Sequence, residues 1–222
     1  MQIANATGCE AVAISAGIFV ASRDLDKISP RWEWRTFSAS LDALERGIGL
    51  LADATPRDSS EIYVLSLHGP QNAKLRDGLI DIKRLQQVDD EGLELWEPVF
   101  KAKFPLGRSD IAIAFSEWHL PLPALSRDSY TIEEFLNSLI AAQPALRVAR
   151  VDKSRRSFVF QGCIAEFVRL SVDLHLLQSF SLEHEDRSLI LAALEQLGLD
   201  SHANTSYPLG LKRALGLDRV EA

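Results

Sequence analysis

Cationic side chains recur in pairs, two residues apart, in segments that have the pattern of β-strands. Lys74 and Arg76 form one pair, and Lys153 and Arg155 form another. Because side chains two residues apart on a strand point to the same side, each pair presents two cations to one face of a sheet. Lys83, in the segment LIDIKRL, likewise lies opposite its apolar neighbours. Lysine and arginine arranged in this way suit an anionic ligand such as a phosphate.

Two carboxylates, those of Glu183 and Glu185, share one face of a later strand. Carboxylates stacked in this way repel each other unless solvent, basic residues or a cation relieves them. If the sheet curls so that this face meets the basic strands, the interior suits a triphosphate, with Mg²⁺ or Mn²⁺ held by the carboxylates. The alternative, which the pattern leaves open, is a sheet with one solvated face.

The elements that must position these residues are strands joined by short connections, with helices between some of them. Short connections favour antiparallel pairing, and Asp77-Gly78 is a hairpin signal. We expect strands at 31–37, 61–67, 73–77, 79–85, 110–115, 146–151, 156–161, 163–170 and 178–185. We expect helices at 40–52, 131–142, 186–198 and 206–216, and a helix-like segment at 92–104. The sequence therefore predicts an α+β protein, an antiparallel sheet or barrel with helices outside.

Composition limits the classes of partner. The 222 residues carry a net charge of -7, which argues against nucleic acid or an anionic membrane as a partner of the whole surface. The apolar stretch 9–21 follows no Lys or Arg and is too short to span a bilayer, so it predicts neither a secretion signal nor a membrane anchor. Cys9 and Cys163 match no metal or disulfide framework, and we interpret both as buried thiols of a cytoplasmic protein.

The order of the charged motifs resembles that of the CYTH (triphosphate tunnel) family, which includes class IV adenylyl cyclases, thiamine triphosphatases and inorganic triphosphatases. The matching motifs, in chain order, are Arg31-x-Glu33-x-Arg35, Lys74-x-Arg76, Ile80-Asp81-Ile82-Lys83, Lys153-x-Arg155, Glu183-x-Glu185 before a helix, and a closing Ser206-Tyr207. The resemblance implies an antiparallel eight-stranded tunnel over residues 31–216, with an N-terminal extension at 1–30 and a tail at 217–222.

The resemblance also implies roles for these residues. Glu33, Glu183 and Glu185 would be catalytic and hold Mg²⁺ or Mn²⁺. The phosphates would be bound by Arg35, Lys74, Arg76, Lys83, Lys153 and Arg155. Arg31 stands where the family has its first glutamate, which weakens the expected metal site. Glu166 is expected to be a buried partner of a basic residue.

Three functions follow as hypotheses. The first is metal-dependent hydrolysis of an inorganic, nucleoside or thiamine triphosphate. The second is a non-catalytic module that binds a triphosphate or polyanion through a degenerate metal site. The third is a structural or interaction protein whose N-terminal extension covers the tunnel mouth. Fold similarity alone does not choose among them.

Overall fold

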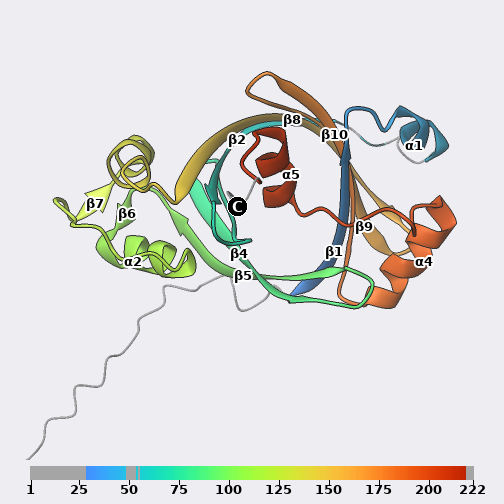
Figure 1. The fold of residues 1–222 in the computed structure, drawn as a ribbon, viewed down its shortest axis with the longest axis horizontal. Coiled ribbons are helices and arrows are strands. Elements are labelled where there is room, and N and C mark those ends of the chain that lie inside the picture. The colour runs from blue at the N-terminus through green and yellow to red at the C-terminus, as the bar shows by residue number, and fades with distance from the viewer. Residues whose placement is uncertain (1–28, 49–53, 55, 219–222) are drawn as a thin grey trace, which may run out of the picture.

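The computed structural model describes residues 29–48, 54 and 56–218, and its centre is a closed antiparallel barrel of eight strands (Figure 1). Around the barrel the strand order is β1-β10-β9-β8-β2-β3-β4-β5. The strands are β1 (Arg31–Ser38), β2 (Arg57–Ser66), β3 (Asn72–Arg76), β4 (Leu79–Val88), β5 (Glu94–Lys103), β8 (Leu146–Phe160), β9 (Cys163–Val172) and β10 (His175–His184). The predicted α+β class and the eight-stranded barrel are confirmed. The proposed N-terminal extension lies outside the described residues except for its last two.

The strands follow the predicted alternation in most places. Asp77 and Gly78 have φ of 53° and 73°, the left-handed pair that closes a tight hairpin between β3 and β4. The two strands expected at 146–151 and 156–161 are one strand, β8. Its polar stretch does not interrupt it because β8 pairs with β2 on one side and with β9 on the other.

Two predicted elements are wrong. The helix-like segment 92–104 is strand β5, because neighbours on both sides, β4 and β1, supply its backbone hydrogen bonds. Pro98, which lacks an N–H, lies beside an irregularity of the β4–β5 register. The expected strand at 110–115 is part of helix α2 (Arg108–Glu117). Asp110 accepts a hydrogen bond from the Gly107 N–H at the start of α2, and Ile111, Ala114 and Phe115 are buried at helical spacing.

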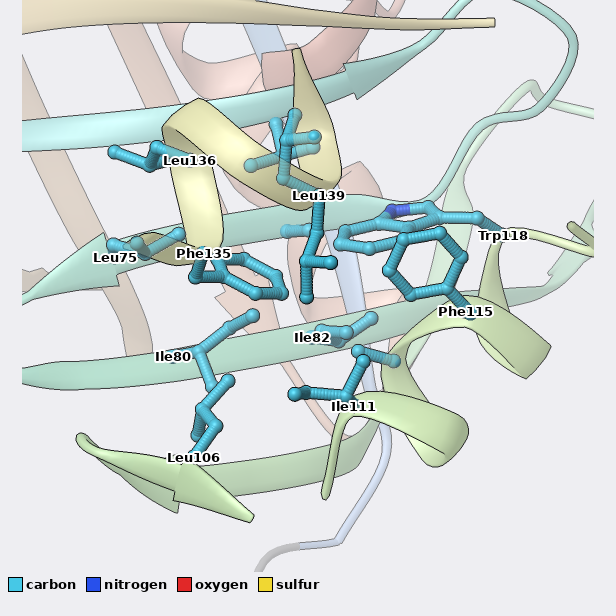
Figure 2. Close-up of a cluster of buried hydrophobic side chains, with 14 of the residues drawn as sticks. Leu75, Ile80, Ile82, Leu106, Ile111, Phe115, Trp118, Phe135, Leu136 and Leu139 are labelled. Atoms are coloured by element: carbon cyan, nitrogen blue, oxygen red, sulfur yellow. The ribbon is translucent and has the colours of Figure 1, made fainter. Parts of the chain in front are cut away.

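One side of the barrel is covered by an insertion between β5 and β8. It contains the short strands β6 (Leu106–Gly107) and β7 (Ser129–Tyr130), helix α2, and α3 (Ile132–Glu134) continued by the π-helix η3 (Phe135–Ile140). Thr131 and Glu134 form a capping box at the start of α3. Figure 2 shows Phe115, Trp118 and Phe135 packed over Ile80 and Ile82, whose side chains leave the outer face of β4. The apolar residues of this strand therefore face outward, and the charged ones face the interior.

Helices α1 (Asp42–Gly47) and α4 (Arg187–Leu197) lie on the opposite side of the barrel (Figure 1). The helix predicted at 186–198 is confirmed as α4, with Asp186 accepting from the Ser188 N–H at its start and Gly198 left-handed at φ 66° at its end. Trp34 is buried in the cluster beneath α4. Helix α1 begins at Asp42, whose N–H donates to the Ser40 hydroxyl at 3.4 Å, and residues 49–52 of the predicted helix lie outside the described part.

The last helix, α5 (Tyr207–Ala214), lies within the outline of the barrel in Figure 1 and not outside it, as we had expected. Tyr207 and Leu211 are buried among Tyr63, Val151 and Leu170. The segment that leads into α5 is hydrogen-bonded to β1. The Arg35 N–H donates to Asn204 Oδ1, and the Thr205 N–H donates to the Arg35 carbonyl, both at 2.7 Å. An apolar plug therefore fills one half of the interior.

Two further observations concern membrane-spanning helices and the thiols. Across the described ranges, no helix is long and apolar enough to cross a membrane. Cys163 is buried, as predicted, and Cys9 lies outside the described residues.

Candidate functional site in the barrel interior

Three glutamates occupy one rung of neighbouring strands. Glu33 on β1 pairs with Glu183 on β10 and with Glu94 on β5. Glu33 accepts a hydrogen bond from Arg35 Nε at 2.8 Å, and although burial opposes the charged form, Arg35 and Lys83 lower the pKa of Glu33. Burial and the charge of Glu33 raise the pKa of Glu183, and burial raises that of Glu94 to about 7. Three carboxyl groups therefore share this rung, and the Arg35 guanidinium bonds to one of them, Glu33.

Lys83 is the cation that faces this rung. Burial opposes its charge, but Glu183 and Glu33 outweigh burial and raise the pKa of Lys83. Within the described parts of the chain, no carboxylate lies within 4.0 Å of the Lys83 ammonium. Lys74, on the adjacent strand β3, is 3.9 Å from Asp81. Lys83 is therefore a charged group that the described fold leaves without a close anion, whereas Lys74 has one long contact, to Asp81.

A second cluster surrounds Glu61 on β2, which the sequence analysis did not identify. Glu61 accepts hydrogen bonds from Lys153 at 2.8 Å and from Arg76 at 3.0 Å, and Arg155 lies 3.6 Å away. The Tyr63 hydroxyl also donates to Glu61, at 2.9 Å. Burial would raise the pKa of Glu61, but Lys153 outweighs burial and lowers it to about 2. Three of the six predicted phosphate ligands therefore already share a carboxylate.

Lys153 joins this cluster to the plug. Its ammonium donates to the Tyr63 hydroxyl at 2.7 Å and lies 3.9 Å from the ring centre of Tyr207, close enough for a cation–π interaction. Arg35 lies 4.8 Å from the same ring. Burial lowers the pKa of Lys153 to about 7, although Glu61 raises it in part. Tyr63 and Tyr207 therefore form the boundary between the charged half of the barrel interior and the half that the apolar plug fills.

The remaining predicted residues are more exposed than Glu33. Arg31 is on the same face of β1 as Glu33 and is partly exposed. Glu185 follows the end of β10 and is exposed. Glu166, expected to be a buried partner, lies 4.0 Å from Arg155, but its side chain is 23% exposed. The structure thus brings Glu33 and Glu183 together and leaves Glu185 at the rim.

The carboxylate rung can be compared with the needs of a divalent cation. In the part of the chain that the structure describes, no three His, Cys, Asp or Glu side chains are close enough to enclose a metal. Mg²⁺ does not require such a cage, because it usually keeps several waters and takes one or two carboxylates plus phosphate oxygens. Glu33 and Glu183 fit that donor set, and a cation would relieve the repulsion that raises the pKa of Glu183.

Two cavities are lined by residues of the charged clusters. A small one, about 60 Å³, is lined by Lys74, Arg76, Asp81 and Lys101, among others. A larger one, about 880 Å³, lies along β2, β8, β9 and β10, and serines and leucines dominate its lining. Lys153 and Arg169 line this larger cavity beside two aspartates, so no excess of cations gathers there. The small cavity is lined mainly by charged residues around Lys74 and Arg76, whereas Lys153 of the Glu61 cluster lines the larger one.

Comparison with known proteins finds likeness only at the level of structure. No family model matches the chain, and no curated protein matches its sequence. Among solved structures, a conserved hypothetical protein from Pyrococcus furiosus matches with a TM-score of 0.46 and 14% identity, over 80% of this chain and 98% of that one. A candidate adenylate cyclase from Bacillus halodurans matches with a TM-score of 0.45 and 12% identity, over 82% and 95%.

A third structure is a candidate adenylyl cyclase from Hippeastrum with a dominant triphosphatase activity. It matches with a TM-score of 0.44 and 12% identity, over 84% of this chain and 96% of that one. Likeness this distant says nothing about the reaction of this chain. The closed eight-stranded barrel itself agrees with the divergent CYTH domain that the motif order predicted, and any function must be argued from its interior.

Proposed function

We propose that this divergent CYTH-type barrel binds a triphosphate in its charged half and hydrolyses it with a divalent cation. The observation that carries the proposal is the rung of Glu33 and Glu183 opposite Lys83, an ammonium without a close carboxylate. A ligand that is itself anionic and brings a cation satisfies both sides of this arrangement. Inorganic, nucleoside and thiamine triphosphates all have that chemistry.

Each group has a distinct part in this proposal. Lys83 and Lys74 bind phosphate oxygens and offset the negative charge that develops on the leaving phosphate. Glu33 and Glu183 hold Mg²⁺ or Mn²⁺, which supplies further neutralisation of the phosphates. Arg35 keeps Glu33 ionised through their 2.8 Å contact. Tyr207 of the plug, whose ring stacks on that of Tyr63, limits how far the ligand enters.

The balance of charge supports a requirement for metal. Six interior cations were predicted as phosphate ligands, but Glu33, Glu61, Glu94, Glu166 and Glu183 lie among them, with Asp81 beside Lys74. A triphosphate that entered this nearly neutral interior alone would meet little net attraction. Divalent cations that enter with it supply the missing positive charge.

A non-catalytic anion-binding barrel is the second candidate. It is favoured by Arg31, which occupies the position of a motif glutamate, and by the ion pair that Glu33 already makes with Arg35. Both features weaken a metal site without removing Lys74 and Lys83. This candidate requires anion binding that persists in chelator, whereas the enzyme requires turnover that chelator abolishes.

The test is phosphate release from inorganic triphosphate, ATP and thiamine triphosphate with Mg²⁺ or Mn²⁺. We expect chelator to abolish release and Glu183→Gln to lower it at least about 100-fold, the scale on which single charge-stabilising groups act. Glu195→Gln, an exposed glutamate of α4, is the matched control and keeps wild-type turnover. Triphosphate binding in chelator with no release from any substrate would instead establish the non-catalytic barrel.

A further inference from the structure

Glu61 is a buried anion at the point where three cations converge. Its side chain is 1% exposed, and the nearest atoms of Lys153, Arg76 and Arg155 lie 2.8, 3.0 and 3.6 Å from its oxygens. These cations come from two strands, β8 and β3, that flank β2 in the barrel. A carboxylate that takes charged hydrogen bonds from several directions occupies the place that a phosphate group would take in such a cluster.

A ligand phosphate cannot share these cations without cost. Its oxygens would lie within a few ångströms of a second anion in a water-poor interior, where repulsion between like charges is strong. Glu61 cannot escape this by protonation, since its pKa of about 2 keeps it ionised at neutral pH. It also cannot turn away freely, because Tyr63 and Lys153 hold the same oxygen, at 2.9 and 2.8 Å.

We infer that Glu61 is a built-in counter-anion that competes with the ligand for Arg76, Lys153 and Arg155 and so sets the affinity of the barrel for polyphosphate. This inference rests on the proposed function, because it concerns the same interior. The six predicted phosphate ligands thus fall into two groups. Three are held by Glu61, and the others are available to the ligand, with Lys74 and Lys83 as the principal members.

The experiment is calorimetric titration of inorganic triphosphate into the full chain and its Glu61→Gln variant, each with Mg²⁺. The variant frees Arg76 and Arg155, the two guanidinium partners of Glu61, so the dissociation constant should fall at least about tenfold. Unchanged or weaker binding by the folded variant would overturn the inference. Glu166→Gln is the matched control, since it removes another interior carboxylate near Arg155. An equal gain in that control would mean that only total charge matters, which also overturns the special role of Glu61.

A second variant covers the case in which Glu61→Gln does not fold. Glu61→Gln combined with Lys153→Gln removes both charges of the 2.8 Å pair and conserves the interior charge. Because the double variant frees Arg76 and Arg155 for the ligand, it should bind triphosphate at least as tightly as wild type, and loss of binding would refute the inference. If wild type itself binds no triphosphate, the proposed function fails, whereas wild-type binding without a gain in the variants refutes the Glu61 inference alone.

Discussion

Lys153 is the residue whose environment differs most from that of an ordinary lysine. It donates to Glu61 and Tyr63 and lies over the ring of Tyr207, away from bulk water. Burial lowers its pKa to about 7, while an unfolded lysine titrates near 10.4. Folding therefore releases a proton from Lys153 between these two values, and the stability of the protein must depend on pH in that window.

The sign of this dependence gives a prediction. Between pH 7 and pH 9 the unfolded state binds more protons at Lys153 than the folded state, so the free energy of unfolding rises with pH. We expect wild type to gain about 1–3 kcal/mol relative to Lys153→Met over this range in urea unfolding. Lys101→Met, which removes an exposed lysine, should keep the wild-type slope. If the free energy of unfolding changed with pH equally in wild type and Lys153→Met, the lowered pKa of Lys153 would be contradicted.

At the same scale, the sequence indicated some interior residues and missed others. The pairs Lys74 with Arg76 and Lys153 with Arg155 stand out because charge alternates with apolar residues on their strands. Glu61 and Tyr63 alternate in the same way within EIYVLSL, but a single carboxylate and a tyrosine are weaker signals than a pair of cations. Glu94 was missed for another reason, since its segment was interpreted as a helix. Its place opposite Glu33 depends on a pairing 61 positions distant.

Among the elements, α5 determines how deep the interior is. Tyr207 stacks on Tyr63 with ring centres 5.1 Å apart and meets Phe37 edge to face at 5.3 Å. Gly210 lets the helix approach so closely that a Cβ atom there would lie 2.4 Å from the Phe37 ring. The chain needs glycine at this position because of this contact and not because of its backbone angles.

This contact predicts the effect of one added methyl group. Gly210→Ala must displace either Phe37 or α5, and overpacking of this kind costs about 1–3 kcal/mol. Gly47→Ala is a suitable control, because a Cβ atom at that position meets nothing within 4 Å, and it should change the free energy of unfolding by less than about 0.5 kcal/mol. Thermal and urea unfolding of both variants measure the difference. Equal stability of Gly210→Ala and wild type would show that α5 is not seated against Phe37.

The elements also show where reasoning from sequence pattern reaches its limit. Hairpin β3–β4 and helix α4 were predicted well, because their turn and cap residues are local signals. Segments 92–104 and 110–115 were assigned the wrong type, since short apolar runs fit either period and only neighbouring strands or caps decide between them. The position of α5 inside the barrel is a tertiary feature, and its own sequence indicates only that it is a helix.

For the whole molecule, the main feature is a barrel whose interior is divided into a charged half and an apolar half. Glu33, Glu183 and Lys83 lie in the first, and Tyr207 and Leu211 fill the second. The resemblance of the motif order to the CYTH family predicted the closed barrel, and alternation along the strands predicted which side chains could share a face. It did not predict the near balance of interior charge, which depends on Glu61 and Glu94.

The central claim is that Lys83 and its surroundings bind the phosphates, and calorimetric titration of inorganic triphosphate with Mg²⁺ tests it most directly. Lys83→Gln and Arg84→Gln each remove one positive charge from adjacent residues of β4, but Arg84 pairs with Glu117 of α2. We expect Lys83→Gln to weaken binding at least about tenfold, and Arg84→Gln to change it by less than about twofold. Equal effects of the two variants, or tight binding by Lys83→Gln, would contradict an anion site inside the barrel.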